Sequence, residues 1–469
     1  MRSIPHLGVL AMLGLGLACT APDSSSPTAA ADEETTARPD IGPVALDEAD
    51  DDLADGAALR HDEAGTRALV FQWNDLATRA VGNAGAGPDA LPPFVEAVVY
   101  ALANTAMHDA LNAIHPRYAR YAHTGAGASD ASATAAAAQA AHDVLVAVLP
   151  PFPELEVALA ANLAAVPDVA ARNAGVAVGK AAAGAILATR IDDGSAAAQV
   201  PYTFGTQPGD YRATPPFDGP PFNGFAAVPA WGKVRPFVMR SGSQFRVPPP
   251  YGRRSNADAV KTARYAREYR EVVRLGGTVS DRTADQSEIA LFWLENSPLG
   301  WNRMARTLAE RHGLGAWRAA RLFALVGLAE ADAYIATFDS KYHYNFWRPF
   351  TATQLDDGNP ATDAAPSWSV FAFPTPPIPD YPSGHGTAGG AAAAVLWFVF
   401  RGDTGPFEAT SSSLPGVTRH FRSPWDAAWE NADSRIYAGY HFRLATEAGT
   451  VQGAAVGFWA ATHALRRLH

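Results

Sequence analysis

The sequence contains little cysteine, little lysine and little charge for its length. Of its 469 residues only Cys19 is a cysteine, which excludes a disulfide framework and any zinc or iron–sulfur site built from cysteines. Lysine occurs at four positions, and charged residues make up 18% of the chain against 48% hydrophobic residues. That balance excludes a mainly disordered, collagen-like or coiled-coil protein. The length is enough for one large domain or two modest ones.

The excess of acidic residues is confined to one segment. The chain has 47 Asp and Glu against 37 Lys and Arg, a formal net charge of −10. Residues 21–66 hold 13 acids and two bases, whereas residues 67–469 hold 34 of each. The acidic segment is rich in Ser, Pro, Thr and Ala and cannot bury enough apolar surface to fold, so we expect a disordered tether over residues 20–67. Neither the neutral body nor this tether indicates a nucleic-acid partner.

The first nineteen residues resemble a secretory signal. Arg2 precedes an apolar run, Leu7 to Leu17, that is too short for a comfortable transmembrane span. Cys19 stands where a lipoprotein signal carries its lipidated cysteine, although Gly16 occupies the position where Leu is usual. Two interpretations remain open: a lipid anchor on Cys19, with no transmembrane span in the mature protein, or ordinary cleavage and release. Both predict export, to the periplasm, to a membrane surface or to the medium.

From Ala68 onward, apolar residues recur at helical spacing. Residues 95–114 place Val95, Val99, Leu102 and Ala106 near one face of a helix. We find no pairs of alternating strands, and the sequence predicts an all-α fold of helical bundles with loop-rich excursions. Similar helical patterns occupy the Ala-rich stretch 128–190 and the ranges 257–275, 283–296, 301–312 and 315–338.

One long segment interrupts these helical patterns. Residues 201–253 are rich in Pro, Gly, Phe and Tyr, which is typical of a structured excursion rather than a helix. A loop-rich excursion of this size is a candidate wall for an active-site entrance.

The first of three polar segments contains Lys341 and Arg348. The two residues are seven positions apart, two helical turns, so they share a face if the helix continues that far. Pro349 predicts that the helix ends at this point. Taken alone, such a pair is typical of a solvated helix rim.

The second segment runs from Asp380 through Ser383, Gly384 and His385 into an apolar stretch. That stretch is too short to span a membrane and too apolar for a surface helix, so we expect a buried core helix. Ser383 would cap its N-terminus, where free N–H groups and the helix dipole attract anions. A cap needs no histidine two residues later, and Gly384 would let a ligand approach the backbone closely.

The third segment contains Arg435 and His441. Six residues apart, they would lie on different faces of an unbroken helix, but Gly439 offers a break that would let both point at one site. A single histidine on such a helix is more often a satisfied core residue than a ligand. The indication of a site comes from the three segments occurring together, in order.

Together these segments resemble the pattern of the vanadium-dependent haloperoxidases and the related type 2 phosphatidic acid phosphatase superfamily. The pattern is K-x6-R-P, then P-S-G-H, then S-R-x5-H, matched by Lys341 to Pro349, Pro382 to His385 and Ser434 to His441. Two upstream stretches, FQWNDLATRA and MHDALNAIHP, are similar to the bacterial haloperoxidase-like branch. The resemblance implies a helical catalytic domain over 68–469, with its motifs in 341–445.

The resemblance also implies a site for vanadate or phosphate, which share tetrahedral geometry and negative charge. It implies that His441 is the axial vanadium ligand and that His385 is a general acid and base. Five residues would bind the oxygens of the anion: Lys341, Arg348, Ser383, Gly384 and Arg435.

Two activities follow from the same residues. In a haloperoxidase, vanadate activates hydrogen peroxide so that a halide is oxidised to hypohalous acid, which then reacts with a small organic acceptor. In an acid phosphatase, the alternative, His441 forms a phosphohistidine and no vanadate is needed. A third hypothesis is a binding or structural surface lipoprotein, disfavoured because every binding residue is retained. The sequence leaves a homo-oligomer open.

Two positions depart from the family pattern. Ala445 stands where an acid usually follows the last histidine by four residues, and this absence favours the haloperoxidase slightly. Ile378 stands where fungal and algal haloperoxidases carry Phe or His, so we expect bromide to be a better substrate than chloride. Asp285 and Glu288 are candidates for carboxylates behind a binding arginine, or else begin a solvated helix.

Overall fold

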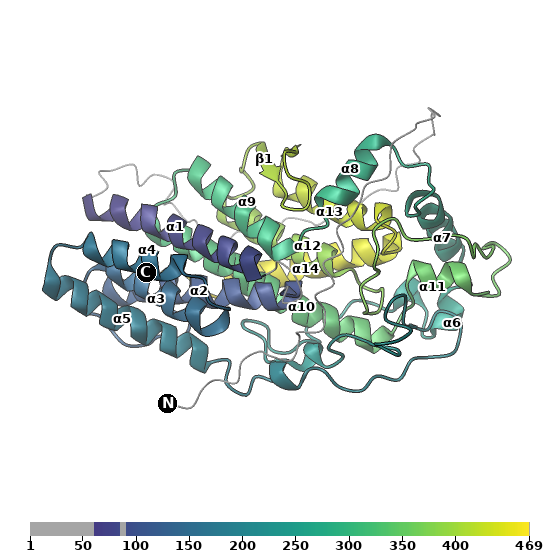
Figure 1. Cartoon of the computed structure of the whole chain (residues 1–469), viewed down its shortest axis with the longest axis horizontal. Coiled ribbons are helices and arrows are strands. Elements are labelled where there is room, and N and C mark those ends of the chain that lie inside the picture. The colour runs from purple at the N-terminus through teal and green to yellow at the C-terminus, as the bar shows by residue number, and fades with distance from the viewer. Residues whose placement is uncertain (1–60, 85–90, 469) are drawn as a thin grey trace.

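The computed structural model describes residues 61–84 and 91–468, so the predicted export signal and most of the predicted tether lie outside the described residues. Helices dominate the described part, which confirms the all-α prediction (Figure 1). Its strands form one short antiparallel hairpin, β1 (Phe407–Thr410) and β2 (Thr418–Phe421), which residue alternation did not reveal. No helix in this part is both long and apolar enough to cross a membrane.

The first helical bundle contains α1 (His61–Ala84), α2 (Pro93–Ile114), α3 (Ala133–Val148), α4 (Glu154–Ala164) and α5 (Val169–Ala188), at the left of Figure 1. The start of α1 corrects the predicted domain boundary, because residues 61–67, assigned to the tether from their composition, form its first turns.

Small residues let the helices of the first bundle approach closely. A Cβ added at Gly175 of α5 would lie 2.3 Å from the backbone oxygen of Ser132, which caps α3. A Cβ at Gly179 would lie 2.5 Å from the backbone oxygen of Ala136. The Ala-rich composition of residues 128–190 therefore reflects a dense α3–α5 contact.

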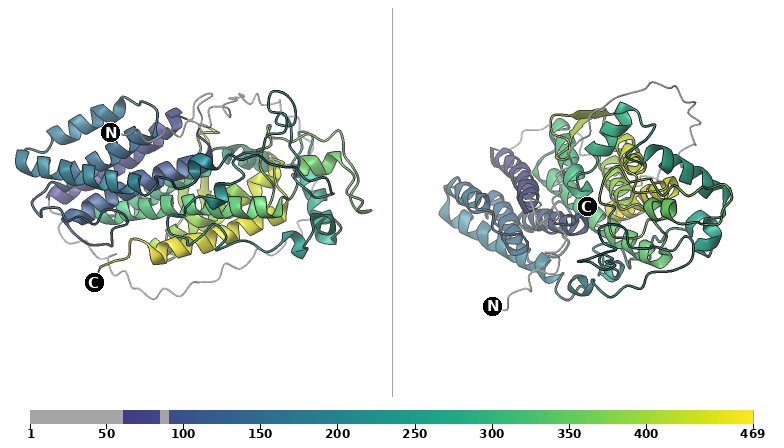
Figure 2. Two further views of the ribbon diagram at one scale, coloured as in Figure 1. Left: turned by 90° about the horizontal axis from the view of Figure 1, so that it is seen from below. Right: turned by 45° about the vertical axis from the view of Figure 1, so that its right-hand side comes forward.

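The second bundle contains α9 (Ser297–Arg311), α10 (Ala316–Tyr344), α12 (Gly384–Val399), α13 (Pro424–Tyr437) and α14 (Arg443–His463). The apolar α12 is the buried core helix that its sequence predicted, and it packs along α14. A Cβ at Gly453 of α14 would lie 2.0 Å from the oxygen of Thr387, so glycine allows this close approach. Figure 2 shows the two bundles side by side along the longest axis of the molecule.

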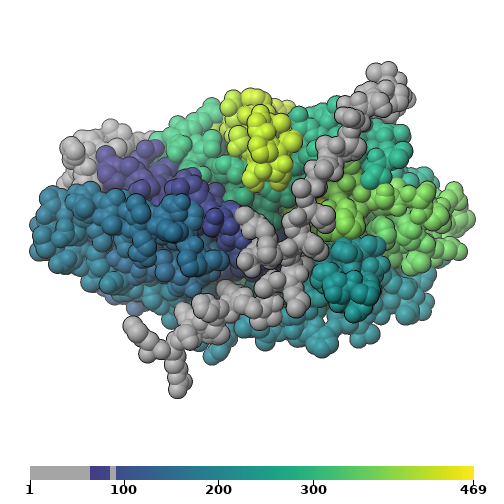
Figure 3. Space-filling model, viewed as in Figure 1, coloured from purple at the N-terminus to yellow at the C-terminus, as the bar shows by residue number. Residues whose placement is uncertain are grey.

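Helix α10 joins the two bundles. Its 29 residues span about 44 Å at 1.5 Å per residue, and it packs against α2 on one side and α12 on the other. In the space-filling view, residues of the first bundle make up one end of the molecule, and the later helices and the 201–253 excursion make up the other (Figure 3). The longest helix thus carries the first motif from the core of both bundles towards the far end of the second.

The excursion over residues 201–253 contains only 3-10 turns, η3 (Trp231–Lys233) and η4 (Pro250–Gly252), as its composition predicted. An earlier turn, η2 (Ser195–Ala197), precedes it. The excursion is fastened to the motif segments: Tyr211 N–H donates to Asn345 O at 2.7 Å, and the Tyr381 hydroxyl donates to Pro248 O at 2.8 Å. It therefore lies against the first and second motifs, where an entrance wall was expected.

The remaining helices are short and lie mostly at the far end of the second bundle. They are α6 (Asn256–Ala259), α7 (Ala263–Leu275), α8 (Ala284–Phe292) and α11 (Pro349–Gln354). The predicted helix 257–275 is thus two helices, because Thr262 caps a new helix by accepting from Tyr265 N–H at 3.2 Å.

Candidate active site

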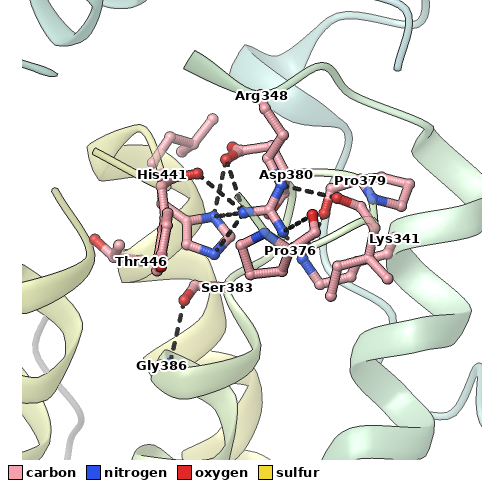
Figure 4. Close-up of polar contacts among 12 residues, drawn as sticks. Lys341, Arg348, Pro376, Pro379, Asp380, Ser383, Gly386, His441 and Thr446 are labelled. Carbon is pink, nitrogen blue, oxygen red and sulfur yellow. Dashed lines mark hydrogen bonds and ion pairs between the residues drawn. The ribbon is translucent and has the colours of Figure 1, made fainter. Parts of the chain in front are cut away.

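The three motif segments meet where several helix ends converge in the second bundle. Lys341 lies in the last turn of α10, Arg348 precedes α11, and Ser383 precedes α12. Arg435 lies in the last turn of α13, and His441 lies in the link to α14. Figure 4 shows the Arg348 guanidinium between the His441 ring and the 376–380 segment, with Ser383 at the start of α12.

Lys341 and Arg348 converge by a different route from the one that their spacing predicted. Helix α10 ends at Tyr344, and Asn345 adopts a left-handed conformation with φ 51°. Arg348 is extended, with φ −82° and ψ 156°, as expected for the residue before Pro349. The helix therefore does not continue far enough for the two residues to share a face, and a turn in the chain brings the two cations together.

Backbone carbonyls hold the Arg348 guanidinium in place. Its Nε donates to Ile378 O at 2.8 Å, and one terminal nitrogen donates to Tyr440 O at 2.9 Å and to His441 Nε2 at 3.0 Å. The other terminal nitrogen is 3.4 Å from Pro376 O. Burial lowers the pKa of Arg348, but a guanidinium keeps its charge in a protein. The result is a fixed, fully buried cation.

Lys341 is a second fully buried cation. Its Nζ donates to Pro379 O at 2.6 Å and to Asp380 O at 2.9 Å. Burial, together with the nearby charge of Arg348, lowers the pKa of this ammonium. An ammonium has three N–H donors, so one remains for a ligand.

Ser383 caps α12 and lies in the site at the same time. Its Oγ accepts from Gly386 N–H at 3.3 Å, which leaves the hydroxyl proton for a further acceptor. At Gly384 an added Cβ would meet Tyr334 at 3.6 Å, an ordinary contact. The neighbouring protein atoms therefore do not require glycine here, and close approach of a ligand remains the reason for it.

Arg435 and His385 complete the polar lining. Arg435 donates to Trp293 O at 2.9 Å, and its buried Nε has no hydrogen-bond partner among the described residues. Burial lowers the pKa of Arg435 to about 10. His385 Nε2 lies 3.2 Å from Glu295 O, which can only accept, so Nε2 carries the proton. Burial and the charge of Arg435 lower the pKa of His385, which is therefore neutral near pH 7.

Access differs among these residues. Lys341, Arg348 and Ser383 are fully buried, whereas Gly384 and His385 are partly exposed. Within the site, the start of α12 is thus the more exposed part.

Gly439 makes the break that lets Arg435 and His441 share a site, as predicted. Its φ is 83°, and an added Cβ would lie 2.2 Å from the oxygen of Gly276. Helix α13 ends just before it, at Tyr437. Burial, followed by the charges of the three nearby cations, lowers the pKa of His441, so this ring is neutral.

Asp380 is the residue that sequence reasoning missed. Its Oδ1 lies 2.8 Å from His441 Nδ1, and its side chain is 1% exposed. Burial raises the pKa of Asp380 to about 8, while the charges of Arg348 and Lys341 act in the opposite direction. With this pKa the carboxyl group is largely protonated near pH 7, and its Oδ1 still serves as the acceptor for His441 Nδ1. The one sequence feature that could have pointed to Asp380 is Ala445, which stands where the family pattern usually has an acid. Because Asp380 supplies an acidic side chain to His441, Ala445 no longer favours the haloperoxidase over the phosphatase.

The two upstream carboxylates do not contact a binding arginine. Asp285 and Glu288 pair with Arg419 at 3.0 and 2.7 Å. Arg419 also pairs with Glu430 at 2.7 Å, which accepts from Trp293 Nε1 at 3.0 Å. Asp285 and Glu288 are therefore connected to Arg435 only indirectly, through Arg419, Glu430 and Trp293.

The donor set fits a tetrahedral oxyanion. We define the cationic cradle as Lys341, Arg348 and Arg435, three buried basic side chains near one buried acid, Asp380. The cradle adjoins the N-terminus of α12, whose free N–H groups and dipole also favour an anion. The unpartnered Nε of Arg435 and the free Ser383 hydroxyl proton add directional donors. Vanadate and phosphate both match this arrangement.

Comparisons with known proteins agree with the motif. A family model described as the VCPO second helical-bundle domain matches residues 321–469. Vanadium chloroperoxidase of Curvularia inaequalis is 29% identical over 289 residues, 48% of this chain and 46% of the relative. The chain thus spans about half the length of this curated relative.

Solved structures cover more of the chain. A structure described as the first bacterial vanadium-dependent iodoperoxidase has a TM-score of 0.71 and 26% identity, covering 85% of this chain and 97% of that one. A bacterial vanadium-dependent chloroperoxidase has a TM-score of 0.64 and 18% identity, covering 81% and 95%, which shows a shared fold. The motifs, the cradle and these likenesses agree in supporting the vanadium haloperoxidase superfamily for this chain.

Proposed function

We propose that this protein is a vanadate-dependent haloperoxidase that uses hydrogen peroxide to oxidise a halide to hypohalous acid. The observation that carries the proposal is the cationic cradle, buried around one neutral histidine. Buried cations are costly unless they are paired, and this set matches a multiply charged oxyanion. The relatives named for chloride and iodide oxidation support the same chemistry.

Each residue of the site then has a role in holding vanadate. The cradle neutralises the oxygens, and the guanidinium forks of Arg348 and Arg435 add direction. The Ser383 hydroxyl and the Gly384 N–H donate to the anion from the start of α12. His441 would hold vanadium through Nε2, the nitrogen that faces Arg348 at 3.0 Å when no anion is bound. When bound, vanadate supplies a Lewis acid that activates peroxide towards halide.

His385 handles the proton that the reaction consumes. Forming hypohalous acid and water from peroxide and halide requires one proton. With Nε2–H held on Glu295 O, the Nδ1 of His385 is the atom free to take up a proton, from peroxide or from solvent, and to deliver it to the oxygen that leaves as water. The lowered pKa of His385 keeps it neutral and ready to accept.

The halide and the location are further parts of the proposal. Bromide is proposed over chloride because Ile378 offers an aliphatic side chain where fungal and algal haloperoxidases carry Phe or His. Small organic molecules are the proposed acceptors. Export rests on residues 1–19, and fractionation of cells that express wild-type protein or Cys19→Ala would separate a lipid anchor from release.

The proposal is tested with purified protein, orthovanadate, peroxide and bromide, followed with a bromination-indicator dye. We expect dye bromination that depends on vanadate, is weaker with chloride, and is lost in His441→Ala. His463→Ala, an exposed histidine at the end of α14, is the matched control and should retain activity.

A parallel assay measures phosphate release from p-nitrophenyl phosphate. Vanadate-independent phosphate release without bromination would overturn the proposal in favour of a phosphatase. Neither activity, with no vanadate binding, would indicate the binding or structural protein.

A further inference from the structure

We propose that Asp380 is a positioning residue that fixes the proton of His441 on Nδ1 and turns Nε2 towards the anion. The proposal rests on the proposed function, since it concerns the histidine that would hold vanadate. In the family pattern, an acid four residues after the last histidine would orient that histidine. In this chain that position is Ala445. The proposal gives this role to Asp380, which lies in the second motif.

The tautomer of His441 follows from its two neighbours. Arg348 can only donate, and its terminal nitrogen lies 3.0 Å from Nε2 and 3.4 Å from Nδ1. Nε2 is therefore the accepting nitrogen. In a neutral ring the proton must then be on Nδ1, which lies 2.8 Å from Asp380 Oδ1. A carboxylate on the far nitrogen is the usual way in which a metal-binding histidine is oriented.

Backbone hydrogen bonds tie residue 380 to the segments that carry Lys341 and Arg348. Its backbone N–H donates to Phe346 O at 2.8 Å, and its backbone oxygen accepts from Lys341 Nζ at 2.9 Å. Its Oδ1 also lies 4.0 Å from a terminal nitrogen of Arg348. Asp380 is thus tied to two cradle cations and to His441, so moving it would disturb the ring orientation.

Contacts at the N-terminal end of α14 bring Asp380 close to the His441 ring. The Ser383 N–H donates to Ala445 O at 2.8 Å, which joins the second motif to the first turn of α14. Ala445 is 1% exposed and packs among apolar neighbours such as Phe442 and Tyr381. The second motif therefore lies directly against the segment that carries His441, and its carboxyl group takes the free edge of the ring.

The test compares Asp380→Ala and Asp380→Asn with wild type, using Asp109→Asn as the matched control. Asp109 forms the other fully buried contact between a carboxylate and a histidine among the described residues, 3.1 Å from His108 Nδ1. The first readout is the ¹⁵N spectrum of histidine-labelled protein without vanadate, with the His441 signals assigned from His441→Ala. The second is the dissociation constant for vanadate.

In wild type we expect a protonated Nδ1 and an unprotonated Nε2. Asp380→Ala should shift the His441 signals towards a mixture of tautomers and weaken vanadate binding about 10- to 100-fold, the usual effect of losing such a partner. Asp380→Asn keeps the shape and should have an intermediate effect. Asp109→Asn should leave both readouts unchanged.

Unchanged His441 signals and unchanged vanadate affinity in Asp380→Ala would overturn the proposal. If that variant does not fold, Asp380→Asn decides by the same two readouts. The tautomer measurement needs neither vanadate nor turnover. A wild type with the expected tautomer but no bromination would therefore contradict the proposed function and leave the role of Asp380 standing.

Discussion

Glu96 should make the stability of the protein fall as the pH rises through neutrality. Glu96 lies in the first turn of α2, and its Oε1 accepts from Asn296 Nδ2 at 2.7 Å, while Oε2 has no partner among the described residues. Burial raises its pKa from 4.5 to about 8. Between these values the folded protein holds a proton that the unfolded chain has released.

The sign and size of the effect follow from proton linkage. Because the folded state binds the extra proton, the free energy of unfolding decreases by about 1.4 kcal/mol per pH unit between about pH 4.5 and pH 8. The full effect is about 5 kcal/mol and is complete above pH 8. Glu96→Gln keeps the acceptor for Asn296 and removes the titration. The variant should therefore gain stability relative to wild type as the pH rises.

The assay is chemical unfolding of both proteins at pH 5.5, 6.5, 7.5 and 8.5. Since both share every other titrating group, their difference isolates Glu96. Val279→Ala, an exposed position without a titratable group, is the control and should run parallel to wild type. Parallel curves for Glu96→Gln and wild type would refute the assignment of a buried, protonated Glu96.

Three further predictions concern residues of the site. Gly439→Ala should lower the free energy of unfolding by more than about 3 kcal/mol and abolish activity, because the added Cβ would lie 2.2 Å from a backbone oxygen at a φ of 83°. The control is Gly252→Ala, at φ 67° with open space around it. It should lower the free energy of unfolding by about 1 to 2 kcal/mol and leave activity intact. Ser383→Ala should cost about 1 kcal/mol through the lost cap and also weaken vanadate binding, whereas Ser132→Ala, which removes the cap of α3, should change stability alone. Arg435→Lys keeps the charge but loses the fork, and should weaken vanadate binding about 10- to 100-fold with the fold retained.

Each of these is checked by thermal unfolding and vanadate titration on the same preparations. Equal losses for the two glycine variants would contradict the close approach at Gly439. Normal vanadate affinity in Ser383→Ala or Arg435→Lys would remove that residue from the anion site.

Periodicity and motifs predicted much of the fold and most of the site. Helical spacing located the helices because each buries an apolar stripe. Gly439 was expected to break the helix before His441, and in the structure it does so with a φ of 83°. The tripartite pattern brought together the cradle, Ser383 and the two histidines. These features are local, or are held within short segments.

The missed features depend on contacts between distant segments. Asp380 and His441 are 61 residues apart, and nothing in either segment specifies their 2.8 Å contact. The acceptors for Arg348 and Lys341 are backbone carbonyls, which carry no sequence signal. Helix α10 ends at Tyr344 with Asn345 in a left-handed conformation, four residues before Arg348, so the condition for a shared helix face is not met.

The most direct test of the central claim is vanadate stoichiometry measured on the same samples as bromide oxidation. The account predicts one vanadate bound per chain, bromination that rises in proportion to occupancy, and loss of both in His441→Ala. Bromination that persists after vanadate is removed, or a wild-type protein that binds no vanadate, would contradict it.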